Sequence, residues 1–132
     1  MELVVDTSVL IAVIVGEPER DAIVSVTSDQ TLIGPGSIPW EVGNAFTAMV
    51  KQRRIDVEDA RKGLEIFDSI PLRYVHTDMA NALSIAAREG IYAYDAYFLD
   101  CAVRYRAPLL TLDRQLKRAA ERLGVKLLNL EA

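Results

Sequence analysis

Cysteine and histidine are nearly absent from this sequence, which contains only Cys101 and His76 among its 132 residues. A single cysteine excludes an intrachain disulfide and a multi-cysteine zinc cluster, and a single histidine argues further against a zinc site. We therefore expect a cytoplasmic protein. Long apolar runs are also missing, since Asp6 interrupts the stretch from Leu3 to Val15, and we expect neither a signal peptide nor a membrane anchor.

Excess positive charge is a third absence. The net charge is −4 and the isoelectric point is about 5.0, which disfavours broad electrostatic attachment to nucleic acid. A nucleic-acid substrate would need a bound metal or a local basic patch. Arg114 and Lys117, shortly after Asp113, could supply one by reaching a phosphate, although basic side chains at such positions often form only a solvated helix face.

What the sequence does contain is an alternation of strand-like and helix-like segments in a chain the length of one domain, residues 1–132. Short apolar runs predict strands at 3–6, 32–33, 72–75, 109–112 and 126–128. Turn and capping residues predict helices from 18 to about 26, from 39 to about 53, after Asp56, from Thr77 to Gly90, at 94–105 and at 113–123. This pattern indicates an α/β domain with a parallel sheet of about five strands and helices on both faces.

Four acidic residues fall where one predicted element ends and the next begins: Asp6, Glu41, Asp95 and Asp113. Asp6 closes the first strand, Asp113 follows the fourth, and Glu41 lies in the first turn of the helix after the second strand. The helix that starts near Asp95 ends near Pro108, which leads into the fourth strand, so its start lies at the carboxyl edge. Ligands of parallel sheets bind at that edge, and we expect all four carboxylates to meet there.

Carboxylates brought together in a low-dielectric site repel one another, and a divalent cation is the usual means of neutralising them. Glu41 or Asp113 alone could simply complement a helix dipole and cap free amide groups. Asp6 is harder to explain in that way, because a carboxylate that closes an apolar strand is costly unless it is paired or coordinated. Together the acids predict a metal-dependent phosphoryl-transfer enzyme.

Polar neighbours of these acids are candidates for supporting roles. Thr7 and Ser8 follow Asp6, and Asn44 shares a helix face with Glu41. We expect them to orient a carboxylate or a water molecule.

Two other features have plainer interpretations. Asp100 is five residues beyond Asp95 and should point away from the acids, as a surface or structural residue. An aromatic-rich stretch could stack on bases, but its helical spacing favours core packing or a dimer interface. It comprises Tyr92, Tyr94, Tyr97, Phe98 and Tyr105.

Four segments in order resemble the PIN-domain family, and more narrowly the toxins of VapBC toxin–antitoxin pairs: Val4–Val9, Pro39–Ala45, Tyr94–Leu99 and Leu109–Leu116. The resemblance implies an endoribonuclease whose metal, Mg²⁺ or Mn²⁺, is bound by the four acids with Thr7, Ser8 and Asn44 in support. It further implies a homodimer and an antitoxin partner that blocks the acidic pocket. Asp100 and Trp40 depart from the family pattern and bear on local packing and substrate choice.

Two rival interpretations remain, and a third is disfavoured. A PIN-like module could bind RNA or protein without cutting, and a PIN nuclease could act without an antitoxin. A phosphotransferase with an aspartate nucleophile would need a second acid two residues after Asp6, where this sequence has Ser8. The favoured mechanism is in-line attack on an RNA phosphodiester by a water molecule that a bound cation activates.

Overall fold

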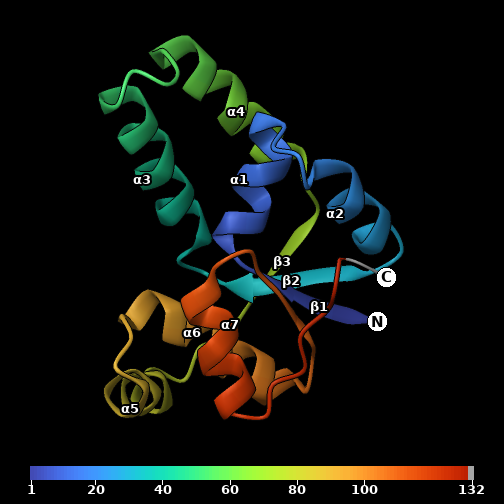
Figure 1. The fold of residues 1–132 in the computed structure, drawn as a ribbon, viewed down its shortest axis with the longest axis vertical. Helices are drawn as coiled ribbons and strands as arrows, with labels where there is room; N and C mark the ends of the chain where they lie inside the picture. The colour runs from blue at the N-terminus through green and yellow to red at the C-terminus, as the bar shows by residue number, and fades with distance from the viewer. Residues whose placement is uncertain (131–132) are drawn as a thin grey trace.

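Strands and helices alternate along the chain in the computed structural model, which describes residues 1–130 (Figure 1). The elements are β1 Glu2–Val5, α1 Thr7–Val15, α2 Arg20–Thr27, β2 Thr31–Pro35, α3 Ile38–Lys51, α4 Val57–Ser69, β3 Leu72–Val75, α5 Met79–Glu89, α6 Ala93–Tyr105, β4 Leu109–Leu110 and α7 Arg114–Arg122. None of the helices that residues 1–130 form combines the length and apolar character of a membrane span.

The strands form one parallel sheet in the order β3-β2-β1-β4. Val4 in the central strand β1 pairs with Ile33 of β2 on one side and with Leu109 of β4 on the other. Because all four strands run the same way, their carboxyl ends share one edge, as predicted. The α/β class with a parallel sheet is confirmed.

Within residues 1–130 the sheet has four strands rather than about five. Residues 126–128 make only an isolated bridge, in which Leu127 pairs with Leu109. Two backbone hydrogen bonds of 2.9 Å support this bridge, from Leu109 to Lys126 and from Leu128 to Leu109. β4 itself is only two residues long. Residues 126–128 therefore have too few strand residues beside them to form a longer ladder of backbone hydrogen bonds.

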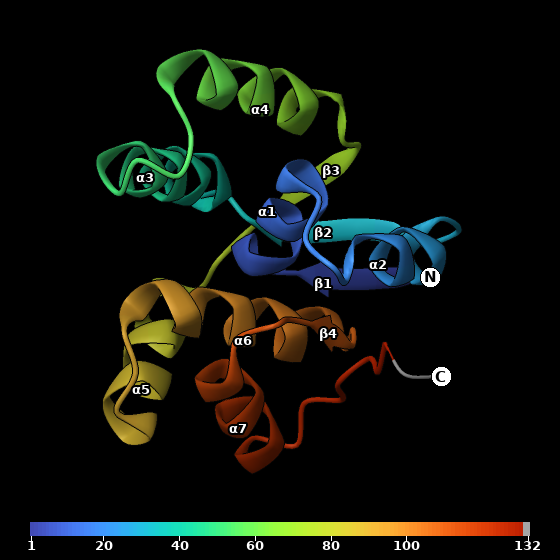
Figure 2. The ribbon, with the colours of Figure 1, turned by 45° about the horizontal axis from the view of Figure 1, so that its top comes forward.

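Helices cover both faces of the sheet, as Figure 2 shows: α1 to α4 lie on one side, and α5 to α7 on the other. The first group is held together by contacts of α1 with α2, α3 and α4, while α6 packs against the sheet and α5 packs against α6. Leu3, Val4 and Val5 of the central strand are consequently almost fully buried, which is typical of a strand in a two-sided parallel sheet.

Helix α1 is an element that the sequence pattern does not predict. It begins at an N-cap, Asp6, and ends at Gly16, whose φ of +77° suits glycine. Four consecutive residues from Val9 to Ala12 are buried, because the sheet lies on one side of the helix and other helices on the others. A helix buried all round has no amphipathic period from which it could be recognised.

Helix boundaries elsewhere lie close to the predictions. Asp56 caps α4 through a capping box with Asp59, and Gly90 ends α5 with a φ of +66°. The N-cap of α5 is Asp78 rather than Thr77, because the Asp78 carboxylate accepts a hydrogen bond from the Asn81 amide.

Candidate functional site

The four acids occupy helix starts at the carboxyl edge of the sheet. Asp6 follows β1 and caps α1, and Glu41 lies in the first turn of α3. Asp95 lies in the first turn of α6, and Asp113 caps α7. Figure 1 shows α1 and α3 beginning where β1 and β2 end. The crossover connections of a parallel sheet therefore bring together residues that are more than a hundred positions apart in the sequence.

Asp6 is the most deeply set of the acids, with 5% of its surface exposed. One carboxylate oxygen accepts hydrogen bonds from the Ser8 hydroxyl at 2.6 Å and the Val9 amide at 3.2 Å, and the other accepts from the Thr111 hydroxyl at 2.6 Å. Burial raises the pKa of Asp6 from 3.8 to about 6 even though these hydrogen bonds lower it, and the charge of Asp113 raises it further. The carboxylate is held rigidly and ionises at a cost.

Glu41 is fixed by two hydroxyl groups from different elements. Thr7, at the start of α1, donates to one carboxylate oxygen at 3.1 Å, and Ser37, before α3, donates to the other at 2.6 Å. Burial raises the pKa of Glu41, and the charges of Asp6 and Asp95 add to the effect. The Thr7 bond ties the first turn of α3 to the first turn of α1.

Asp95 and Asp113 keep free oxygens. Among residues 1–130, no donor contacts the half-buried Asp95 carboxylate, whose pKa is raised by burial and by the charge of Asp113. Asp113 is exposed, and one of its oxygens accepts the Leu116 amide at 3.0 Å. These two carboxylates can therefore contact a ligand without first breaking a hydrogen bond.

Charge interactions link the four acids in a ring. Asp6 interacts with Asp113 and Glu41, and Asp95 interacts with Glu41 and Asp113. Within the described residues, however, no three His, Cys, Asp or Glu side chains are close enough to hold one ion between them. The four acids therefore converge at one edge of the sheet, as predicted. They are close enough to repel one another electrostatically, but no three of them are close enough to bind one ion together.

The donor chemistry of this ring fits a magnesium-like ion. Carboxylate oxygens are hard ligands, and Mg²⁺ in proteins is usually held directly by only one or two of them, with water and substrate phosphates as the remaining ligands. Asp95 and Asp113 have the oxygens for such contacts. Whether the four acids act as metal ligands or catalytic groups stays a prediction.

The predicted supporting residues divide into two kinds. Thr7 and Ser8 contact acids directly, and Ser8 also accepts the Leu112 amide at 3.1 Å, which joins α1 to the segment after β4. Asn44 is exposed, and its side chain makes no hydrogen bond to residues 1–130. The structure therefore brings two of the three to the acids.

Sequence reasoning missed two hydroxyls that contact the acids. Thr111 is buried, donates to Asp6 and accepts the Asp113 amide at 3.0 Å, so it couples two of the acids. Ser37 occupies the N-cap position of α3, yet it bonds the Glu41 side chain rather than the helix backbone. The sequence offered one signal for each of them: Thr111 is a hydroxyl residue at the end of a strand, and Ser37 is a hydroxyl residue four positions before an acid.

The two predicted phosphate contacts, Arg114 and Lys117, are exposed on α7 and make no ion pair within residues 1–130. Lys117 also lines a surface pocket of about 590 Å³ together with Thr111 and Leu112. Both cations are near the acidic ring in the chain and free to bind an anion, and their role stays a prediction.

Asp100 is a structural residue, which is one of the two roles expected for it, and it is not a surface acid. It is 1% exposed and accepts hydrogen bonds from the Asp78 amide at 2.9 Å and the Asn81 side chain at 2.7 Å. Arg104 lies 3.7 Å from the same carboxylate. These partners tie α5 to α6, so Asp100 is part of the contact between the two helices.

The aromatic stretch is only partly core. Phe98 is buried, and Tyr97 and Tyr105 pack against the core. Tyr92 and Tyr94 are instead exposed by 82% and 53%. They lie at the N-cap position and in the first turn of α6.

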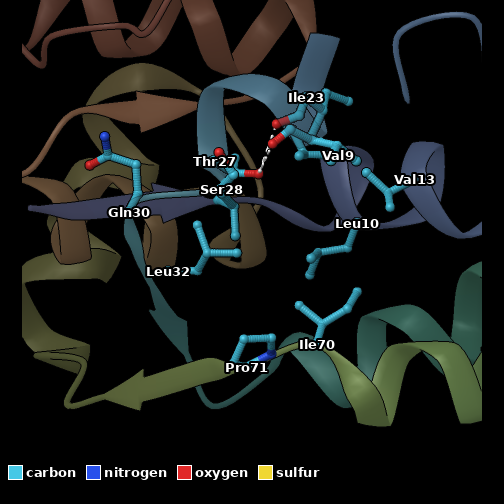
Figure 3. Close-up of a pocket in the computed structure, with 12 residues that line it drawn as sticks. Val9, Leu10, Val13, Ile23, Thr27, Ser28, Gln30, Leu32, Ile70 and Pro71 are labelled. Atoms are coloured by element: carbon cyan, nitrogen blue, oxygen red, sulfur yellow. Dashed lines mark hydrogen bonds between the residues drawn. The ribbon is translucent and has the colours of Figure 1, made fainter. Parts of the chain in front are cut away.

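A separate apolar pocket of about 250 Å³ lies between α1, α2 and β2. Figure 3 shows its aliphatic lining, with Leu10, Val13 and Leu32 facing the hollow, and the Thr27 hydroxyl bonded to the Ile23 carbonyl at 2.7 Å. None of the four acids lines it. Its surface suits an apolar contact rather than phosphodiester chemistry.

Comparisons with known proteins agree with this architecture. The family model of the PIN domain matches residues 3–122. The chain is similar to Ribonuclease VapC3 of Pyrobaculum aerophilum, with 29% identity over 121 residues, which cover 88% of this chain and 92% of the relative.

Two solved structures share the fold. PAE2754 from Pyrobaculum aerophilum has a TM-score of 0.70 at 22% identity, over 90% of this chain and 79% of that chain. VapBC2 from Rickettsia felis, solved bound to a DNA fragment from its promoter, has a TM-score of 0.66 at 18% identity over 98% of each chain.

Proposed function

The chain belongs to the PIN-domain family, and we propose that it is a metal-dependent endoribonuclease that acts as the toxin of a type II toxin–antitoxin pair. The observation that carries the proposal is the ring of four interacting carboxylates at the carboxyl edge of the sheet. Similarity to Ribonuclease VapC3 supports the reaction, and ribonucleases of this family generally depend on divalent metal ions.

In this proposal Asp95 and Asp113 contact Mg²⁺ or Mn²⁺ through their free oxygens, while Asp6 and Glu41 complete the negative site from positions that hydroxyl donors fix. When bound, the cation neutralises phosphodiester charge and lowers the pKa of water. Thr7 keeps the Glu41 carboxylate oriented. Because these donors hold the groups before substrate arrives, little reorganisation is needed during the reaction.

RNA is held locally rather than by the overall charge of the protein. With a net charge of −4, the chain repels a polyanion at long range. Arg114 and Lys117, in the first turns of α7 after Asp113, offer exposed cations to a phosphate on the Asp113 side of the site.

We further propose a homodimer and a cognate antitoxin as partners. The VapBC2 complex of Rickettsia felis shares the fold, and a basic antitoxin side chain would be attracted by four interacting carboxylates. An antitoxin that enters the acidic site would compete with both cation and RNA. Copurification of the chain with the product of a neighbouring gene, and its release from inhibition when that product is removed, tests the pairing.

The deciding experiment is cleavage of a pool of structured RNAs by metal-stripped protein, with and without added Mg²⁺ or Mn²⁺. Asp95→Asn should abolish cleavage while leaving the fold intact, because Asp95 supports no hydrogen bond within residues 1–130. Asp68→Asn, an exposed acid of α4, is the matched control and should cleave normally. An active Asp95→Asn protein would remove Asp95 from the site.

A second candidate is a PIN-like module that binds RNA or protein without cutting it. The observation in its favour is that no three acidic or other ligand side chains among residues 1–130 are placed to share one ion. Binding of RNA without cleavage at any divalent metal concentration would support this candidate against the nuclease.

A further inference from the structure

Exposed aromatic rings border the acidic site. Trp40 directly precedes Glu41 and is 75% exposed, and Tyr94 directly precedes Asp95 and is 53% exposed. Tyr92, two residues earlier, is 82% exposed. Large apolar surfaces left open beside a polar site usually mark a contact with a ligand or partner.

Both aromatic residues adjoin acids that interact with each other. The charges of Glu41 and Asp95 interact, so the first turns of α3 and α6, which carry these acids, are neighbours at the acidic site. Each turn brings a large ring within one residue of an acid. Trp40 and Tyr94 are thus exposed aromatic residues directly next in sequence to two acids of the site.

Both rings stand on an ordered base. Tyr94 packs edge-to-face on Tyr97, with ring centroids 5.7 Å apart and planes at 88°, and Tyr97 packs against the core. On the other side, the bond from Ser37 to Glu41 fixes the turn that contains Trp40. The Tyr94 ring, held in this way, loses little freedom when a ligand stacks on it.

We propose that Trp40 and Tyr94 stack on unpaired bases next to the cleaved phosphodiester. The inference rests on the proposed nuclease function. Stacking suits an acidic site, because the face of a base is uncharged and the carboxylates do not repel it. Bases inside a duplex are already stacked on their neighbours and cannot reach these rings.

A second copy of the chain is a less suitable occupant of the same surface. A symmetric contact through Trp40 and Tyr94 would bring two rings of four carboxylates together, on protomers that each carry a net charge of −4. Exposed aliphatic side chains at Met79 and Leu83 of α5 offer an apolar contact away from that charge. RNA therefore fits the aromatic border better than self-association does.

Trp40 makes the test direct, because it is the only tryptophan in the chain. Asp95→Asn protein with Mg²⁺ is titrated with short single-stranded RNA and with a blunt duplex of the same sequence. Binding is measured by anisotropy of labelled RNA, and stacking by quenching of Trp40 emission. Three substitutions are added one at a time to this background: Trp40→Leu, Trp40→Phe and Tyr94→Ala. Comparing them separates stacking by an aromatic ring from simple apolar contact. The control is Tyr74→Ala, at an exposed tyrosine of β3.

The expected result is quenching by the single strand only, with a loss of affinity of about 5- to 100-fold for Trp40→Leu and for Tyr94→Ala. Trp40→Phe should retain most of the affinity, and Tyr74→Ala all of it. Unchanged RNA affinity in the Trp40 and Tyr94 variants would overturn the inference and leave the nuclease proposal standing.

Failure of the protein to bind any RNA would overturn both. A third result, Trp40 emission that changes with protein concentration alone and a doubled mass that Trp40→Leu abolishes, would reassign this surface to a contact between two copies.

Discussion

Replacing Asp6 by asparagine should stabilise the metal-free protein near neutral pH. Asp6 is almost fully buried beside other acids, so its ionised form is unfavourable in the folded state. The neutral asparagine has the same shape and removes that charge. We expect this gain in stability because the acidic site is arranged to bind a cation, and such an arrangement lowers the stability of the metal-free protein.

The size of the effect follows from the pKa of Asp6, which burial raises from 3.8 to about 6. Because the folded protein holds this proton more tightly than the unfolded chain, the contribution to stability is greatest below the lower value and is lost as pH rises through the higher one. At about 1.36 kcal/mol per pH unit, the loss is about 3 kcal/mol. Imperfect hydrogen bonding of the amide to Ser8 and Thr111 offsets about 1–2 kcal/mol.

Denaturant unfolding in the presence of a chelator, at several values between about pH 4 and about pH 7.5, measures this difference. The free energy of unfolding of Asp6→Asn minus that of the wild type should rise by about 2–3 kcal/mol over the interval and end at a net gain of about 1–2 kcal/mol.

Asp100→Asn is the control. It replaces another buried acid, whose carboxylate is satisfied by Asn81 and lies near Arg104, and it should lose about 1–3 kcal/mol. A difference between Asp6→Asn and wild type that does not change with pH would refute the reasoning.

Three further predictions follow from the same contacts. Thr111→Val removes a hydroxyl that donates to Asp6 and should raise the pKa of that carboxyl, so the pH-dependent loss of stability should move to higher pH and overall stability should fall by about 1–3 kcal/mol; an unmoved pH profile would contradict it. Gly63→Ala places a methyl group 2.7 Å from the Phe46 ring, whereas the corresponding atom at Gly43 meets nothing within 4 Å. Thermal unfolding should show a loss of about 1–3 kcal/mol for Gly63→Ala and a gain of about 0.5–1 kcal/mol for Gly43→Ala, and equal effects would be inconsistent with this packing. Adding Mg²⁺ at a hundredfold excess over Kd should stabilise metal-stripped wild-type protein by about 2.7 kcal/mol, with a smaller rise in Tm for Asp95→Asn; no rise in the wild type would argue against the cation.

The edge that carries the acids was predictable because its signals are local. Apolar runs such as Leu3 to Val5 indicate strands directly, and the next residues mark where each strand ends. Once strands and helices alternate, parallel pairing follows and sends every strand end to one edge. This is why Asp6 and Asp113, at opposite ends of the sequence, could be placed together without coordinates.

Elements whose evidence depends on their surroundings were not predictable. The middle of helix α1, Val9 to Ala12, is buried on all sides, so its sequence lacks the polar face that identifies a helix. The segment near Leu127 is apolar enough for a strand but meets only the two residues of β4. In both cases the deciding information is which neighbours the segment packs against.

The same distinction applies within the site. The sequence by itself determined the fold class and the chemistry of the acids, because strand periodicity and capping are properties of short segments. Only the tertiary structure decided that Thr111 and Ser37 hold two of those acids, that Asp100 is buried between α5 and α6, and that Tyr94 is exposed beside Asp95. Burial and hydrogen bonding depend on chain segments that are distant in sequence, and local patterns carry no record of how those segments meet.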